Sequence, residues 1–129
     1  MTQIDSNVQQ APTDALVHDL LRRNLLEVFG ERDPARRRTV IAQIWAEDGE
    51  FTDSHGRSIG HAAIDQAIAV LHARLPDFVF QERGAAQAFF GVGRVAWGFG
   101  LPGQAPRVTG IDVIEVRGGR IQKLCAFLD

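Results

Sequence analysis

The sequence contains no tyrosine and a single cysteine, Cys125. One cysteine cannot form an internal disulfide, so we expect a reducing, cytoplasmic location. No apolar run approaches the roughly 20 residues that a membrane-spanning helix needs. The opening residues, MTQIDSNVQQAPTD, lack the basic and apolar segments of a secretion signal. With a formal net charge of -2, the chain is not attracted electrostatically to nucleic acid or to an anionic membrane. We therefore expect neither as a partner.

The length and composition indicate one globular domain. The chain has 129 residues, of which 45% are hydrophobic, and at this size a single core buries roughly two thirds of the unfolded surface. No repeat or low-complexity linker divides the sequence. We predict a disordered tail over residues 1–12 and a single domain over residues 13–129.

Apolar residues at helical spacing predict three helices in the first half of the chain, over residues 13–30, 33–45 and 61–73. Thr13 can cap the first helix and Gly30 can end it. Asp33 and Pro34 form a second helix start, because aspartate caps and proline fits the first turn. Arg36–Arg38 are expected to face water. A short strand over residues 50–53 precedes the third helix.

The second half is rich in alternating apolar residues, which predicts strands over residues 78–90, 95–99, 108–116 and 121–128. Gly118-Gly119 suits a two-residue hairpin turn. Three helices followed by strands predict an α+β fold. In the last hairpin both faces of each strand carry apolar side chains. One face can pack on the helices, and a second copy of the chain would cover the other, which predicts a homodimer through the sheet face.

Asp112 lies in the middle of the strand VTGIDVIEV, among valines and isoleucines. With a two-residue turn, Asp112 would lie opposite Cys125. A carboxylate in such a strand is costly unless it is paired, protonated or facing a cavity. Two interpretations remain open: an exposed or arginine-paired aspartate, or a carboxyl group in a pocket.

Asp53 ends the short strand, and His55 follows two residues later. Aspartate at a strand end often only forms the turn. Together with Asp112, however, Asp53 would provide two carboxyl groups in different environments. An open polar site keeps one charged and an apolar site keeps the other protonated, which is the pairing that proton transfer at a carbon beside a carbonyl requires.

Two segments carry a family resemblance: IWAEDGEFTDSHGRSIGHAAIDQAI and VTGIDVIEVRGGRIQKLCAFLD. The first resembles the segment of the nuclear transport factor 2-like superfamily that contains a helix end, the short strand and the following helix. The second resembles the closing hairpin of that superfamily. Within it, the chain looks most like SnoaL-like polyketide cyclases and ketosteroid isomerases, over residues 14–129. The resemblance implies a cone-shaped fold, in which a curved, mixed but mainly antiparallel sheet wraps around three N-terminal helices and encloses an apolar pocket.

By this resemblance, Asp53 matches the general base of the isomerases and Asp112 matches their late-strand acid, with His55 as a possible helper. The tyrosine that partners this acid is missing, because the chain has none. Its place on the first helix falls near Leu25 or Asn24. Asn24 could donate a hydrogen bond to a ligand or could be satisfied by a neighbouring group. We therefore expect a cofactor-independent acid/base enzyme of the isomerase, cyclase or dehydratase type that acts on a carbonyl compound. The alternative is a non-catalytic small-molecule binding module or a dimeric interaction module of the same fold.

The expected ligand is a small hydrophobic molecule. The residues expected to contact it are Asn24, Trp45, Phe51, Ile68, Phe80, Trp97 and Phe99. We expect no cofactor. His61, Asp65 and His72 share one helical stripe, but polar residues at a helix boundary are common, so we expect no metal site either.

Overall fold

The computed structural model describes residues 12–129. The tail predicted over residues 1–12 lies outside this range, apart from Pro12. No helix among the described residues has the length and apolar character needed to cross a membrane.

The helical half begins with α2 (Asp14–Arg23), which continues directly into the π-helix η1 (Asn24–Phe29). The predicted start and end are confirmed: the Thr13 hydroxyl accepts the Leu16 N–H at 3.1 Å, and Gly30 is the C-terminal cap of η1. Helix α3 (Pro34–Ile44) starts where predicted, with an Asp33 oxygen accepting the Arg36 N–H at 2.8 Å. Helix α4 spans His61–Arg74.

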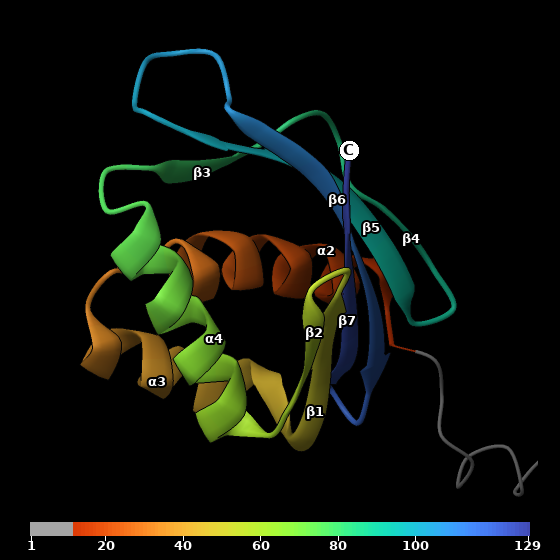
Figure 1. Ribbon diagram of the computed structural model, residues 1–129. Helices are drawn as coiled ribbons and strands as arrows, with labels where there is room; N and C mark the ends of the chain where they lie inside the picture. The colour runs from red at the N-terminus through yellow and green to blue at the C-terminus, as the bar shows by residue number, and fades with distance from the viewer. Residues whose placement is uncertain (1–11) are drawn as a thin grey trace, which may run out of the picture.

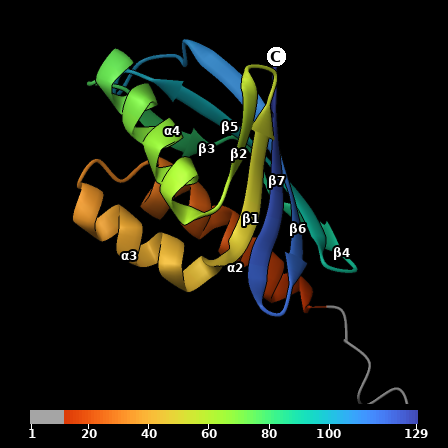
Figure 2. The same cartoon turned by 60° about the horizontal axis from the view of Figure 1, so that its bottom comes forward.

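The remaining elements form one open, seven-stranded mixed sheet in the order β2-β1-β7-β6-β5-β3, with β4 also paired to β5. Its strands are β1 (Trp45–Asp53), β2 (Gly56–Ile59), β3 (Val79–Glu82), β4 (Gln87–Phe89), β5 (Val92–Gly100), β6 (Val108–Arg117) and β7 (Arg120–Leu128). Among the described strand pairs, β1–β7 is parallel and the others are antiparallel. The sheet curves around the helices, which lie against its concave face (Figures 1 and 2). This is the predicted α+β cone.

Three strand predictions need correction. The strand predicted over 50–53 begins earlier, at Trp45, which ends α3 instead of extending its apolar face. The segment between this strand and the third helix, where no strand was predicted, contains β2, which pairs antiparallel to β1. The single strand predicted over 78–90 is two strands, β3 and β4, both paired to β5. Gly84, with φ of 95°, lies in the break between them.

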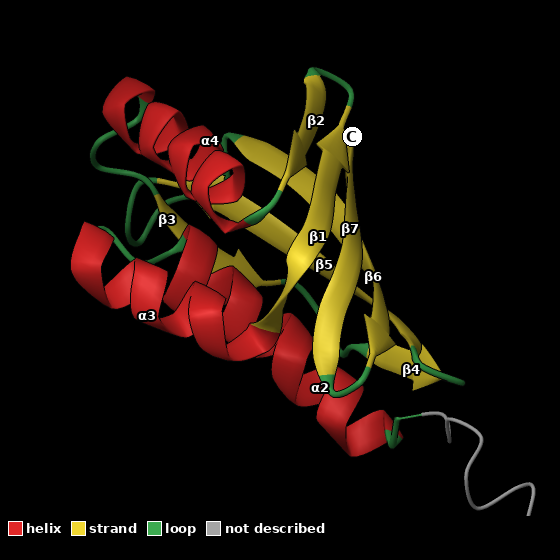
Figure 3. Cartoon of the chain, turned by 90° about the horizontal axis from the view of Figure 1, so that it is seen from below, coloured by secondary structure: helices red, strands yellow, loops and turns green. Residues whose placement is uncertain are grey.

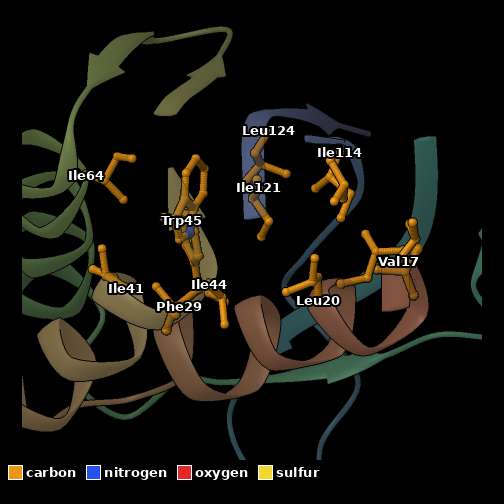
Figure 4. Close-up of a cluster of buried hydrophobic side chains, with 14 of the residues drawn as sticks. Val17, Leu20, Phe29, Ile41, Ile44, Trp45, Ile64, Ile114, Ile121 and Leu124 are labelled. Atoms are coloured by element: carbon orange, nitrogen blue, oxygen red, sulfur yellow. The ribbon is translucent and has the colours of Figure 1, made fainter. Parts of the chain in front are cut away.

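The main core lies between the helices and the concave face of the sheet (Figure 3). Side chains of α2, η1, α3, α4 and the sheet meet in it (Figure 4), among them Val17, Leu20, Phe29, Ile41, Ile44, Trp45, Ile64, Ile114, Ile121 and Leu124. A second cluster of Leu25, Trp97 and Phe99 adjoins it. The second cluster leads into the cavity described below.

Arg37 is buried, with 1% of its surface exposed, although the sequence predicted it in water. Its Nε donates to Asp65 Oδ1 at 2.7 Å, and its Nη1 donates to the Glu31 carbonyl at 3.0 Å. The exposed Arg38 donates to the other oxygen of Asp65. Burial opposes ionisation of Asp65, but the hydrogen bonds from both arginines hold its pKa below the usual value. The pair joins α3 to α4.

His72 completes this buried polar group. Its Nε2 lies 2.6 Å from the Phe29 carbonyl, and its Nδ1 lies 3.4 Å from Arg37 Nη1. An arginine N–H only donates, so Nδ1 accepts and Nε2–H donates. Burial lowers the pKa of His72, and the charges of Arg32 and Arg37 act in the same direction, against the hydrogen bond to Phe29. The ring is therefore neutral in the fold near pH 7.

The two arginines that share Asp65 allow a matched stability test. We expect Arg37→Leu to lower the free energy of unfolding by about 3 kcal/mol, because it removes the buried arginine and leaves Asp65 Oδ1 and the Glu31 carbonyl without their donor. Arg38→Leu should lower it by less than about 1 kcal/mol, because an exposed ion pair contributes little. Urea unfolding at pH 7 measures both values. Equal losses would contradict a structural role for the buried arginine.

Candidate functional site

An internal cavity of about 240 Å³ opens between the sheet, η1 and α4. Its lining is largely apolar and includes two carboxyl groups and one imidazole. The lining residues are Leu25, Phe29, Phe51, Asp53, His55, Leu71, Leu75, Phe80, Trp97, Phe99, Val108, Asp112, Ala126 and Leu128. Apolar walls with a few convergent polar groups are typical of small-molecule sites.

Asp112 projects from β6 into this cavity and is 5% exposed. Trp97 Nε1 donates to its Oδ1 at 2.9 Å. Burial raises the pKa of Asp112 to about 7, and the hydrogen bond from Trp97 opposes this rise only in part. Near pH 7 the carboxyl group therefore holds its proton in a substantial fraction of molecules. With Oδ1 accepting from Trp97, Oδ2 is the atom that carries this proton.

Gly110 makes room for the tryptophan that holds Asp112. It lies opposite Trp97 in the β5–β6 pair, while Asp112 lies opposite Val95. A Cβ on Gly110 would come within 2.5 Å of the Trp97 ring and 2.6 Å of the Phe127 carbonyl oxygen. The indole ring therefore lies over a bare backbone, from which Nε1 reaches the carboxyl group two residues further along β6.

The register of the closing hairpin differs from the prediction by one residue. The Gly118-Gly119 turn has two residues, as expected, with φ values of 57° and 78°. Farther along, Glu115 pairs with Lys123, so Gln122 is an extra residue in β7. Asp112 consequently lies opposite Ala126 and not opposite Cys125. Ala126 faces the cavity beside it.

Asp53 lies at the mouth of the same cavity, at the end of β1. Its Oδ1 accepts the backbone N–H groups of His55 at 2.8 Å and Gly56 at 3.1 Å, which closes the β1–β2 hairpin. The aspartate thus forms the turn and also lines the cavity. The His55 side chain is 79% exposed and lies at the rim. The structure therefore brings Asp53, His55 and Asp112 to one cavity.

Four of the predicted aromatic contacts line this cavity: Phe51, Phe80, Trp97 and Phe99. Phe80 stacks on Phe99, with ring centroids 4.0 Å apart, and meets Trp97 edge-on at 5.5 Å. These rings come from the neighbouring strands β3 and β5. They form a rigid apolar wall beside the Asp112 carboxyl group.

Comparison with known proteins gives structural matches only. The sequence matches no protein-family model and no curated protein. A candidate isomerase of the SnoaL-like family from Agrobacterium tumefaciens str. C58 superposes with a TM-score of 0.83 at 25% identity, over 89% of this chain and 98% of that one. A candidate SnoaL-like polyketide cyclase from Jannaschia sp. CCS1 gives 0.75 at 14% identity, over 93% and 90%.

A third match is an ntf2-like protein of unknown function from Mesorhizobium loti, with a TM-score of 0.67 at 16% identity, over 95% of this chain and 99% of that one. The chain has the nuclear transport factor 2-like fold. The resemblance to SnoaL-like isomerases and polyketide cyclases, expected from two sequence segments, is confirmed by these structural neighbours.

Three residues expected to bind the ligand lie elsewhere in this nuclear transport factor 2-like fold. Trp45 and Ile68 are fully buried in the main core and do not line the cavity. Asn24 is 1% exposed, and its Oδ1 accepts the Trp45 Nε1–H at 2.9 Å. Its Nδ2 has no hydrogen-bond partner among the described residues. Asn24 is thus satisfied in part by a neighbour and does not replace the missing tyrosine.

Several lining residues were missed by the sequence analysis: Leu25, Phe29, Leu71, Leu75, Val108, Ala126 and Leu128. Leu25 and Phe29 belong to η1, whose wider turns change which side chains face inward. Apolar periodicity marks such residues as buried but does not separate cavity wall from core. The sequence did not indicate that Gly110 leaves room for the Trp97 ring, because only the pairing of β5 with β6 places the two residues opposite each other.

Residues 12–129 contain no group of three or more histidine, cysteine or acidic side chains placed to hold a metal. The stripe considered for a metal is engaged otherwise. His61 Nε2 lies 3.0 Å from the carbonyls of Trp45 and Ala46, Asp65 binds two arginines, and His72 contacts the Phe29 carbonyl.

Relative to the wild type, the Asp112→Asn variant should have a higher free energy of unfolding at pH 8 than it has at pH 5. Unfolded Asp112 ionises near 3.8 and folded Asp112 near 7. Between these values the unfolded state has released a proton that the folded state retains, so wild-type stability falls as pH rises. Asparagine cannot ionise. The difference in unfolding free energy, variant minus wild type, should grow by about 2 to 3 kcal/mol between these pH values.

Urea unfolding at both pH values measures this difference, and the contribution of His72 cancels because both proteins contain it. A difference that does not change with pH would show that Asp112 ionises alike in the folded and unfolded chain.

Proposed function

We propose that this protein is a cofactor-independent acid/base enzyme that acts on a small hydrophobic carbonyl compound, by isomerisation, aldol-type cyclisation or dehydration. The observation that carries the proposal is the Asp112 carboxyl group, which lies in an apolar cavity with a pKa raised to about 7. The similarity to a candidate SnoaL-like isomerase supports it. A carboxyl group that is protonated near pH 7 donates a hydrogen bond or a proton without any cofactor.

The proposed roles follow from the two environments. Asp112 Oδ2–H donates to the carbonyl oxygen of the substrate, whose negative charge grows as the enolate forms. Asp53 accepts the proton from the adjacent carbon, since it is the more exposed carboxyl group and is held by two backbone N–H groups. The enol then takes a proton at another carbon or attacks a second carbonyl group. His55 at the rim can relay the proton to water.

The cavity limits the size of the reacting part of the substrate. An apolar protein cavity of roughly 150 Å³ holds benzene. In the same proportion, the cavity of about 240 Å³ would hold a chemical group of on the order of ten non-hydrogen atoms. A four-ring steroid is larger than this, so steroid isomerisation is not the proposed reaction. A monocyclic or bicyclic ketone fits better.

The enzyme proposal is tested by exchange of carbon-bound protons. Small aryl ketones and 1,3-diketones are incubated with the protein in D₂O, and NMR follows loss of the proton beside the carbonyl group. We expect exchange above the buffer rate, and a decrease of about 10²-fold or more in Asp112→Asn and in Asp53→Asn. The control is Asp19→Asn, an exposed aspartate on α2 paired with Arg22. Unchanged exchange in Asp112→Asn would remove the role given to this residue.

A non-catalytic ligand-binding protein is the second candidate. Asn24 does not line the cavity, so it cannot act with Asp112 as the second donor to a developing negative charge. Calorimetric binding of the same ketones without exchange in any buffer would favour this function. A purely structural role is the least supported, because the cone is hollow and not filled by its aromatic side chains.

We also propose a homodimer through the convex face of the sheet. Ile111 and Phe127 are cross-strand partners on this face, as are Val113 and Cys125. Phe127 is 60% exposed in the single chain. These side chains alternate with the cavity-facing ones, so the helices of the same chain cannot cover them. A second copy of the same face would bury them.

We expect the wild type to elute in light scattering with twice the chain mass of 14.2 kDa. Phe127→Asp should give a monomer, because it places a charge in the apolar contact. Phe90→Asp is the control, since Phe90 is 86% exposed in the β4–β5 turn, outside the β6–β7 pair. A monomeric wild type at micromolar concentration would overturn the dimer.

A further inference from the structure

We propose that the natural substrate carries an anionic group, which binds at Arg74 and Arg57 in an outer chamber while its apolar carbonyl part occupies the cavity beside Asp112. The outer chamber has a volume of about 440 Å³ and lies between the β1–β2 hairpin and α4. This inference rests on the proposed function and specifies the class of substrate: a small hydrophobic keto acid.

The outer chamber adjoins the cavity. Five residues line both spaces: Phe29, Phe51, Asp53, His55 and Leu71. A molecule too long for the inner cavity would therefore extend past Asp53 and His55 into the outer chamber. The inner walls are almost entirely apolar, so a charged group on the substrate would be placed in the outer chamber.

The charge of the outer chamber favours an anion. Arg57 projects into it from β2 and Arg74 from the last turn of α4, whereas Asp53 is the one acidic residue among those that line it. Arg57 is partly neutralised by an ion pair, because its Nε lies 3.2 Å from Glu50 Oε2. Arg74 makes no ion pair or side-chain hydrogen bond within the described part of the chain. Arg74 is therefore the main anchor, and Arg57 the secondary one.

The carbonyl groups at the C-terminal end of α4 are bound by another arginine and not by Arg74. The last carbonyl groups of a helix carry partial negative charge and attract nearby cations. Here Arg32 fills that role: its Nη1 donates to the His72 carbonyl at 3.2 Å, and its Nη2 donates to the Leu75 carbonyl at 2.9 Å and to the Phe78 carbonyl. Arg74 remains available for a ligand, with five N–H donors that match a carboxylate.

The test compares neutral and acidic ligands that share one aryl ketone. Butyrophenone is the neutral ligand, and 4-oxo-4-phenylbutanoate and its homologues with three to five methylene groups are the acids. Varying the chain length removes any assumption about the distance from Asp112 to Arg74. Isothermal titration calorimetry at pH 6, where Asp112 keeps its proton and the carboxylic acid ligands are ionised, measures each Kd. We expect at least one acid to bind about ten-fold more tightly than butyrophenone. This difference should become smaller between about 0.05 and 0.5 M salt, because salt screens the attraction between the carboxylate and the arginines.

Arg74→Gln should weaken binding of that acid about five-fold and leave the Kd of butyrophenone unchanged, and Arg57→Gln should have a smaller effect of the same kind. Arg22→Gln, an exposed arginine on α2 outside both chambers, is the matched control. Circular dichroism confirms that each variant is folded. Loss of binding of both ligand types alike in Arg74→Gln would mean a structural role and would overturn the anionic subsite.

The results separate this inference from the proposed function. If no acid binds more tightly than butyrophenone, the subsite is wrong, while ketone binding and proton exchange still test the function on their own. If the acid binds through Arg74 but the wild-type protein exchanges no proton of any ketone, the anionic subsite is supported and the protein is a ligand-binding protein without catalysis. If neither ligand type binds, both the subsite and the ketone site are wrong.

Discussion

The register between β5 and β6 places Gly110 opposite Trp97, and the candidate site depends on this pairing. The bare backbone at Gly110 admits the indole ring, whose N–H holds the Asp112 carboxyl group. A shift of one residue would turn Asp112 to the convex face and Ile111 and Val113 to the concave face. The fold thus fixes a polar group in an apolar cavity through strand pairing. The protonated form of Asp112 follows from that burial.

Asp65 and Asp112 lie in two polar centres with opposite electrostatics. Asp65 is charged, because two arginines reach its two oxygens and lower its pKa. Within residues 12–129 no cation lies beside Asp112, which receives one neutral N–H, so burial dominates and its pKa rises. The first centre ties α3 to α4 and is structural. The second leaves a carboxyl group that is partly protonated near pH 7 in the wall of the cavity, as the proposed function requires.

The shape of the cone divides the space for a ligand by polarity. Apolar rings from β3 and β5 line the inner part, and the β1–β2 hairpin with the end of α4 forms the outer part. Asp53 and His55 lie where the two parts meet. A substrate with an apolar carbonyl end and an anionic end would span both. The nuclear transport factor 2-like fold hosts many activities, so these side chains, and not the fold, carry the functional proposal.

The sequence by itself determined the order of the helices, the hairpin turn at Gly118-Gly119, the α+β class and the two aspartates, since caps, periodicity and turn residues act locally. Only the tertiary structure decided the rest. Arg37 looks solvent-exposed beside two other arginines, but Asp65 from another helix buries it. Trp45 and Ile68 look like candidate wall residues but lie in the core. Which apolar residues surround a cavity depends on contacts between distant strands and helices, including an extra residue at Gln122, and local patterns do not encode these.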